Sequence, residues 1–418
     1  MPAYLSRREF ARLLQLGLLL PLAQPIVASA PGYNFRIRTI TAGLNMNSSA
    51  DLGEAVEAVG FLRSAKSTYE KQGYEVQTLR LATQPMWQYL PDWTNSKSLS
   101  TIKELDRFAV DNNVSISIGP VNSDNSYHPE FADWATELIR QTNNLSFTVN
   151  MASTEGGIHH KSIKAAAEAI LTIGRGTEGG VGNFRFAANA FTPPGTPFFP
   201  AAYFDNGRSF SLGLETPNLL KAAFTGATGL EDAKQKLRTA MNNALNPVAD
   251  LARQMAGKSG WQYLGIDASP APGLDSSIGT AIETLTGLPF GSHKTLSGCA
   301  AITDVLKSLE VQTCGYSGLM LPIMEDSTLA LRAEQGLFSV SELLLYSSVC
   351  GTGLDVVPIP GDTKTDTVAA LLTDVAALAN KYSKPLSARL FPAPGKLARE
   401  TVSFDNPHLT DAVVMPIS

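Results

Sequence analysis

The chain has 418 residues, of which 44% are hydrophobic and 17% charged, a composition typical of globular proteins that bury most of their apolar surface. The formal net charge is −5, with no block of like charges, so nucleic acid is not an expected partner, because phosphate binding needs a clustered basic face. Three cysteines are too few and too far apart for a disulfide framework or a zinc ribbon. The five histidines show no metal-binding spacing, so any metal stays unassigned.

The first thirty residues have the pattern of an export signal. Arg7 and Arg8 lie in a basic head, an apolar run covers residues 13–27, and small residues occupy 28–30. This order is typical of a secretory signal. The paired arginines resemble the twin-arginine motif, which is read by its own export machinery.

An alternative for this segment is an amphipathic or buried N-terminal helix, but Pro21 and Pro25 disfavour a helix interior. The apolar run is also too short and too interrupted for a good membrane span. We therefore predict a twin-arginine signal peptide over residues 1–30, a periplasmic or secreted bacterial location, and one domain over 31–418.

Beyond the signal, apolar strand-like runs alternate with helical patterns almost to the end of the chain. The predicted strands are Phe35–Leu44, Tyr74–Ala82, Val114–Gly119, Leu145–Met151, Asn183–Ala190, Phe210–Leu214, Trp261–Ala268, Val311–Ile323, Leu354–Ile359 and Leu386–Phe391, with a further strand at Ala412–Ile417. The predicted helices include Asp51–Gly73, His160–Ile173, Leu230–Gly257, Ser276–Leu285, Leu296–Leu309, Ser341–Val349 and Asp366–Tyr382. Such alternation is typical of parallel strands joined by crossover helices, an α/β fold.

The number of strands leaves two architectures open. About ten βα steps exceed the eight of the common barrel. The chain therefore forms either a larger α/β barrel or an open, doubly wound sheet, and periodicity does not choose between them.

Several segments, in this order and spacing, resemble those of one uncharacterised family, domain of unknown function 711. They are Phe35–Thr41, Asn150–Thr154, Pro194–Tyr203, Asp267–Pro272, Gly291–His293, Gly318–Asp326 and Cys350–Asp355. The resemblance covers nearly all of the chain after the signal. It implies a fold like the ten-stranded α/β barrel of pyruvate formate-lyase and the ribonucleotide reductases, and so the larger barrel. It implies no substrate, because fold does not set function.

The radical chemistry of pyruvate formate-lyase is not expected here. That chemistry needs a glycine in a C-terminal loop of the Arg-Val-x-Gly-Tyr type, and residues 401–408 contain no glycine. A nucleotide cofactor is not expected either. The glycine-rich stretch 174–180 follows a helical pattern, whereas a phosphate cradle leads into a helix N-terminus.

Four polar side chains suited to acid–base chemistry lie at predicted strand ends or on loops. Asp267 ends one apolar strand and Glu325 follows another, the position from which α/β proteins recruit catalytic carboxylates. Asp355 begins a strand, and His293 lies on a glycine-flanked loop, where an imidazole can exchange protons near neutral pH. For the carboxylates, the alternative to a catalytic role is helix capping. Asp355 can cap the preceding helical region, and Glu325 or its neighbour Asp326 can cap the N-terminus of a following helix.

Two cysteines are further candidates. Cys350 precedes a glycine turn, and Cys314 begins a strand-like run; the resemblance invites comparison of Cys314 with the cysteine inside the related barrels. Either thiol would be a nucleophile if its pKa were lowered, and otherwise a small packing group. Cys299 is expected only to pack. The proline-rich segment Pro193–Pro200 is predicted to be either a rigid pocket wall or a packed loop at the barrel rim.

Two classes of function stay open. The first is an enzyme acting on a small polar metabolite by acid–base or nucleophilic chemistry, lyase-like or hydrolase-like and without an organic cofactor. The second is a periplasmic binding or sensing protein. In both, we expect Asp267, His293 and Glu325 to meet at one opening, with Cys314 inside the barrel and Cys350 nearer the opposite end. The expected partners are a small-molecule ligand and the export machinery, and the sequence is compatible with a homo-oligomer.

Overall fold

The computed structural model describes residues 33–47, 52–94, 96–122 and 124–417. The predicted signal peptide over residues 1–30 lies outside the described residues. Asn34–Ser418 form one structural unit, to which the fold and the sites below belong. Within the described part of the chain, no helix is both long enough and apolar enough to cross a membrane.

A ten-stranded sheet organises this unit, in the order β8-β7-β1-β2-β3-β4-β6-β10-β9, with β5 paired to β4. The strands are β1 Arg36–Leu44, β2 Val76–Thr83, β3 Ser115–Pro120, β4 Leu145–Ser153, β5 Gly157–Ile158, β6 Phe186–Ala190, β7 Ser209–Glu215, β8 Gln262–Pro270, β9 Gly353–Pro360 and β10 Leu386–Ala393. Strands β1, β2, β3, β4 and β6 run parallel to one another. The pairs β7–β8 and β9–β10 run the opposite way. This mostly parallel sheet confirms the α/β class.

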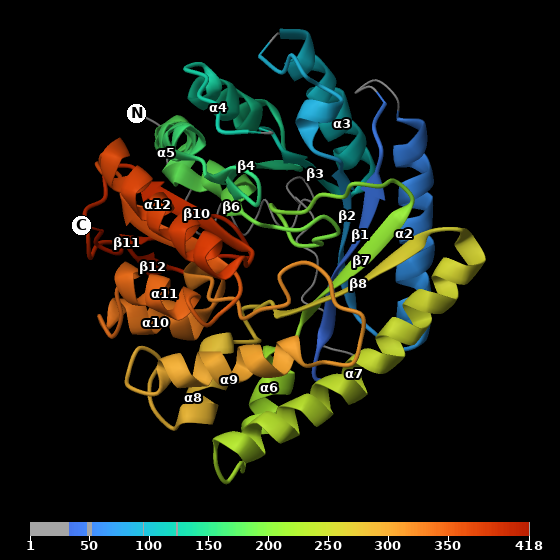
Figure 1. Ribbon diagram of the computed structural model, residues 1–418, viewed down its shortest axis with the longest axis vertical. Helices are drawn as coiled ribbons and strands as arrows, with labels where there is room; N and C mark the ends of the chain where they lie inside the picture. Colours follow the sequence, from blue (N-terminus) through green and yellow to red (C-terminus); the bar gives the residue numbers. More distant parts are fainter. Residues whose placement is uncertain (1–32, 48–51, 95, 123, 418) are drawn as a thin grey trace, which may run out of the picture. The chain divides into compact units, whose positions relative to one another are not determined.

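Helices lie around the outside of the strands (Figure 1). They are α2 Gly53–Lys71, α3 Ser96–Asn112, α4 Phe131–Gln141, α5 His160–Gly176, α6 Pro217–Phe224, α7 Leu230–Ser259, α8 Ile278–Thr286, α9 Thr295–Lys307, α10 Ser327–Glu334, α11 Val340–Ser347 and α12 Thr365–Tyr382, with short 3₁₀ turns η1 Met86–Gln88, η2 Glu178–Arg185 and η3 Ile323–Glu325. Helix α4 illustrates the packing. Its apolar residues Phe131, Trp134 and Leu138 recur every three or four positions and are buried, and Trp134 meets Phe147 of β4 with ring centroids 5.6 Å apart.

The prediction of a strand over Val311–Ile323 is wrong. This segment is irregular, and it lies between the two edge strands, making one parallel bridge to β8 at Thr313 and one to β9 at Pro322. Ser317 has a φ of 40° and Gly315 a φ of 60°, and Pro322 has no N–H, so a continuous ladder cannot form here. No ladder joins β8 to β9 among the described residues. The sheet is therefore open at this point, and the closed barrel stays a prediction.

The proline-rich segment packs directly on the sheet. Thr41 of β1 donates a hydrogen bond to the carbonyl oxygen of Pro197 at 2.8 Å. A methyl group at Gly213 of β7 would lie 2.7 Å from the ring of Phe198, closer than carbon atoms can approach. Glycine is therefore needed at this strand position, because the loop reaches the backbone there.

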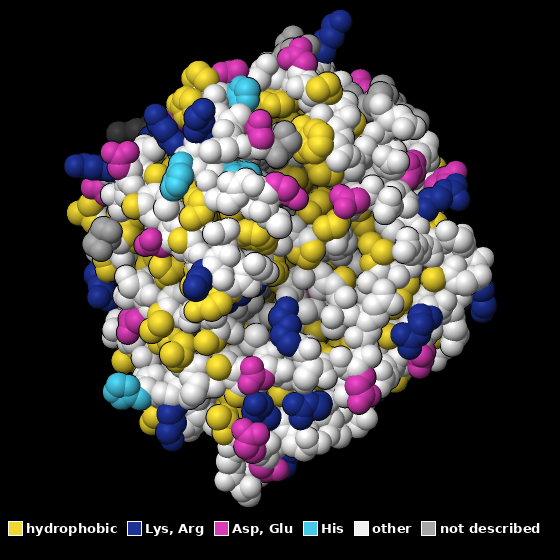
Figure 2. Space-filling view, viewed as in Figure 1, with side chains coloured by type: hydrophobic (Ala, Val, Ile, Leu, Met, Phe, Trp, Pro, Cys, Tyr) yellow, Lys and Arg dark blue, Asp and Glu magenta, His cyan; other side chains and the backbone are white. Residues whose placement is uncertain are grey.

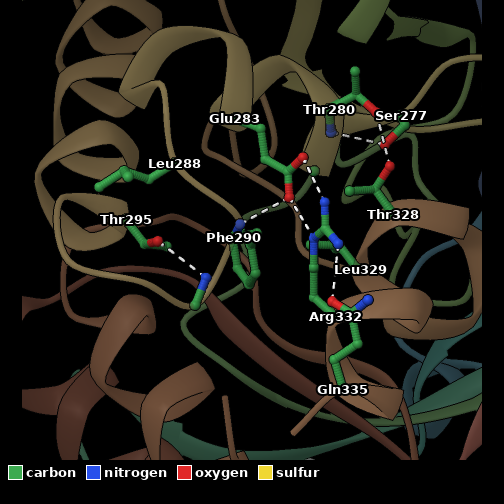
Figure 3. A network of polar contacts seen from close by, with 12 residues as sticks. Ser277, Thr280, Glu283, Leu288, Phe290, Thr295, Thr328, Leu329, Arg332 and Gln335 are labelled. Atoms are coloured by element: carbon green, nitrogen blue, oxygen red, sulfur yellow. Dashed lines mark hydrogen bonds and ion pairs between the residues drawn. The ribbon is translucent and has the colours of Figure 1, made fainter. Parts of the chain in front are cut away.

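Asp326 joins helices α8 and α10. Its buried carboxylate accepts the N–H of Ile278 at 2.6 Å, at the start of α8, and the N–H of Leu329 at 3.0 Å, at the start of α10. The same two helices are held by an ion pair between Glu283 and Arg332 at 2.7 Å (Figure 3). The capping interpretation of this acidic stretch is thus confirmed for Asp326, which is the N-cap of α10.

Candidate functional site

A cavity with a volume of about 830 Å³ lies among the described residues. Its charged lining residues are Arg38 of β1, Arg80 of β2, Arg140 of α4, Glu178 and Arg185 of η2, Glu325 of η3, Asp355 of β9 and Arg389 of β10. The cavity lies near the starts of β1 and β3 and at the end of β8, where Ala271 contributes to its wall. These positions coincide because β8 runs antiparallel to the β1–β3 group.

A chain of ion pairs runs along one wall of this cavity. Arg389 Nε lies 2.5 Å from Asp355 Oδ1, and Arg389 Nη2 lies 3.0 Å from Glu325 Oε1. The other oxygen of Glu325 is 4.0 Å from Arg38, which also contacts Glu215 of β7 at 3.4 Å. Arg389 is buried, and burial alone would lower its pKa, but the two carboxylates raise the pKa of Arg389 overall. The guanidinium therefore stays charged and fixes the positions of both carboxylates.

Arg80 differs from the ion-paired arginines Arg38 and Arg389 of the cavity. Its guanidinium carbon lies 5.6 Å from the ring centroid of Phe199, a cation–π contact. Within the described residues, this guanidinium has no hydrogen bond or ion pair. Burial lowers the pKa of Arg80, and the charges of Arg38 and Arg389 lower it further, against a smaller opposite effect of Glu325. Because a guanidinium keeps its proton at neutral pH, Arg80 carries a charge that a bound anion would stabilise.

His408 brings an imidazole to the same cavity. It lies on the loop between two short strands, β11 Thr401–Val402 and β12 Ala412–Val413. Burial lowers the pKa of His408, and nearby Arg38 lowers it further. The imidazole is therefore neutral at pH 7 and able to accept a proton. Sequence reasoning did not select His408, and the available signal was weak: a histidine on a turn between two very short strand-like stretches.

Five arginines and three carboxylates line this cavity. On the face shown in Figure 2, basic and acidic side chains are interspersed. In the described part of the chain, no three His, Cys, Asp or Glu side chains converge as a metal site. The arrangement is thus suited to an anionic ligand.

Two of the six predicted site residues, Glu325 and Asp355, line this cavity. Cys314 lines a different cavity of about 470 Å³, together with Lys307 and residues of the proline-rich segment. That segment also contributes Phe199 to the larger cavity, so it is both a pocket wall and a packed loop.

Asp267 and His293 do not line the larger cavity. Strand β8 continues to Pro270, so Asp267 lies inside the strand and not at its end. Its fully buried carboxylate accepts the N–H groups of Tyr316 and Ser317 at 2.8 and 2.9 Å, and burial raises the pKa of Asp267. His293 is exposed on the connection between α8 and α9. The expected meeting of Asp267, His293 and Glu325 at one opening is therefore not observed.

The three thiols lie in surroundings that favour packing. Cys299 and Cys350 are buried, and Cys314 is partly buried. Burial raises the pKa of all three cysteines. Each is therefore almost entirely protonated at neutral pH, which is typical of inert cysteines.

The chain matches the family model described as Uncharacterised ACR (DUF711) over residues 31–405. It is 26% identical over 412 residues to a UPF0210 protein of Actinobacillus pleuropneumoniae serotype 5b, covering 92% of this chain and 91% of that protein. The identity and coverage are the same for a UPF0210 protein of Neisseria meningitidis serogroup B. A UPF0210 protein of Desulfovibrio desulfuricans is 29% identical over 305 residues, 67% of this chain and 66% of that protein. The family model spans all ten strands of the central sheet, and the chain belongs to the DUF711 family.

Proposed function

We propose that the arginine-lined cavity binds a small anionic metabolite, a carboxylate or a phosphate ester, and that the protein is an enzyme acting on it by acid–base chemistry. The observation that carries this proposal is Arg80. It is a partly buried guanidinium without an ion-pair partner among the described residues, at the wall of a cavity that four further arginines also line. A planar guanidinium in that position offers paired N–H donors to carboxylate or phosphate oxygens.

The other side chains have complementary roles in this proposal. Arg38 and Arg389 are held by carboxylates, so they contribute a fixed positive field and need no rearrangement when the ligand enters. His408, neutral at pH 7, is the proton acceptor. The reaction would be lyase-like or hydrolase-like, and its residues act without an organic cofactor. The alternative is a binding or sensing protein that uses the same arginines without turnover.

We expect the substitution Arg80→Gln to weaken the binding of the best anion by about 10- to 100-fold. A hydrogen bond to a charged group contributes about 1.5–3 kcal/mol, and the glutamine lacks both the charge and the paired donors. The ligand would be found by titration calorimetry with a panel of dicarboxylates, tricarboxylates and sugar phosphates. Arg253→Gln is the matched control, because Arg253 is exposed and its one ion pair among the described residues is with Asp250 on the same helix. Equal affinities of the Arg80→Gln protein and the wild type would contradict the proposal.

The substitution His408→Gln separates the two classes of function. For an enzyme, this variant should lose turnover of the identified anion. The affinity for the anion should change by no more than about threefold, because an uncharged imidazole at pH 7 forms no ion pair with it. If the wild-type protein binds the anion and never converts it, the binding or sensing alternative is supported.

Export by the twin-arginine route is part of the same proposal. The basic head with Arg7 and Arg8 supports it, because the receptor reads the arginines themselves and not only their charge. We expect the double substitution of Arg7 and Arg8 by lysine to retain the protein in the cytoplasm, as followed by cell fractionation and immunoblotting. An unchanged periplasmic yield would rule out this route.

A further inference from the structure

A cavity that the proposed function does not use lies at the carboxyl ends of three neighbouring strands. It has a volume of about 360 Å³ and is reached by Trp87 after β2, Asn122 after β3 and Val149 within β4. The arginine-lined cavity lies near the starts of β1 and β3. In parallel α/β sheets, ligands bind preferentially beyond the carboxyl ends of the strands.

Aromatic rings form one wall of this cavity. Trp93 is buried against Phe131, with ring centroids 5.7 Å apart, and against His128 at 5.4 Å. Trp87 lies on the turn η1 and is 38% exposed. Among the described residues no other ring stacks on Trp87. A large indole thus remains open to a ligand, although burying it would be favourable.

The lining of this cavity also has polar side chains with unused hydrogen-bonding groups. The side chains of Asp124, Ser126 and His128, all from one loop, make no hydrogen bond or ion pair within the described residues. Asn122 below them is fixed, since its Oδ1 accepts the N–H of Asn150 at 2.7 Å and its Nδ2 donates to Ser162 Oγ at 3.1 Å. The loop therefore starts from a fixed point and presents a carboxylate, a hydroxyl and an imidazole to the cavity.

The charge of the lining distinguishes this cavity from the arginine-lined one. Neither lysine nor arginine lines it, and Asp124 is its one acidic residue. An anionic ligand would therefore be repelled, whereas hydroxyl or ammonium groups would find acceptors.

We propose that this cavity is a second ligand site, which binds a sugar ring without negative charge. The C–H groups on one face of a pyranose ring form an apolar surface that covers an indole such as Trp87, while the ring hydroxyls bond to the polar side chains. The volume accommodates one ring. The site is independent of the proposed function, because none of its lining residues belongs to the arginine-lined cavity.

The test is a saturation-transfer NMR titration of the full chain with glucose, N-acetylglucosamine and glucosamine, beside glucuronate and glucose 6-phosphate. We expect at least one of the first three to bind saturably. The two anionic sugars are measured in the Arg80→Gln variant, in which the arginine-lined cavity is weakened, and there they should bind more weakly than the uncharged sugars by about tenfold or more. Trp87→Ala should reduce the affinity by about tenfold or more, the usual effect of removing an aromatic anchor. Because Trp87 is exposed on a short turn, this variant should fold normally. Asp124→Asn removes the carboxylate, so it should reduce the difference in affinity between the uncharged and the anionic sugars.

Arg80→Gln is the control that separates this site from the arginine-lined cavity, and it should leave sugar binding unchanged. Three results would overturn the proposal. They are no saturable binding of the uncharged or cationic sugars below about 10 mM, wild-type affinity in the Trp87→Ala variant, or, in the Arg80→Gln variant, glucuronate binding as tight as that of glucose.

Discussion

Replacing Asp326 with alanine is expected to lower the free energy of unfolding by about 3–5 kcal/mol. The side chain accepts hydrogen bonds from five donors in two helices, and it is fully buried. The donors are the N–H groups of Ile278, Gly279, Thr328 and Leu329 and the hydroxyl of Ser277. Alanine would leave these donors without an acceptor, and each buried unsatisfied donor costs about 1–3 kcal/mol unless water replaces it.

The measurement is urea unfolding followed by circular dichroism. Ser339→Ala is the matched control, because Ser339 caps only helix α11, together with Glu342. Loss of that single cap should cost about 1 kcal/mol. If Asp326→Ala destabilises the protein no more than Ser339→Ala, then Asp326 does not hold α8 and α10 together.

The comparison of sequence and structure shows which properties a local pattern can predict. Leu319, Leu321 and Ile323 lie in the apolar run that was predicted as a strand, and all three are buried. The strand expected for them does not form, because the backbone at Gly315 and Ser317 and the missing N–H of Pro322 prevent a ladder. Apolar composition reports burial, whereas hydrogen-bond pairing depends on backbone conformation and on partners far away in the sequence.

The candidate site was predictable only in part, for a related reason. Glu325 and Asp355 were selected as carboxylates near strand ends, but the arginines that give the cavity its charge were not. Arg80 and Arg389 lie within predicted strands, where a charged residue usually belongs to an exposed face. Their shared cavity results from pairing between strands far apart in the chain, with β2 and β10 separated by β3, β4 and β6.

Replacing Arg389 with methionine is expected to lower the free energy of unfolding at pH 7 by about 3–5 kcal/mol. The side chains of Glu325 and Asp355 are only 12% and 13% exposed. Without Arg389, both carboxylates would remain in a poorly solvated site after losing their close counter-charge. Breaking a buried ion pair by removing one partner typically has a cost of this size.

The pH dependence provides a second readout for the same variant. In the Arg389→Met protein, Glu325 and Asp355 can lose their unfavourable charges by binding protons, and the folded state then binds more protons than the unfolded state. The free energy of unfolding of the variant therefore rises as pH falls, over the pH range in which the folded state binds more protons than the unfolded state. The variant's loss of unfolding free energy relative to the wild type should be smaller at pH 5 than at pH 7. A protein that also carries Glu325→Gln and Asp355→Asn should recover most of the lost stability at pH 7, since no unpaired charge remains. Urea unfolding at both pH values distinguishes these outcomes. An equal deficit at pH 5 and pH 7, with no recovery in the triple variant, would mean that Arg389 stabilises the fold by packing and not by pairing with the two carboxylates.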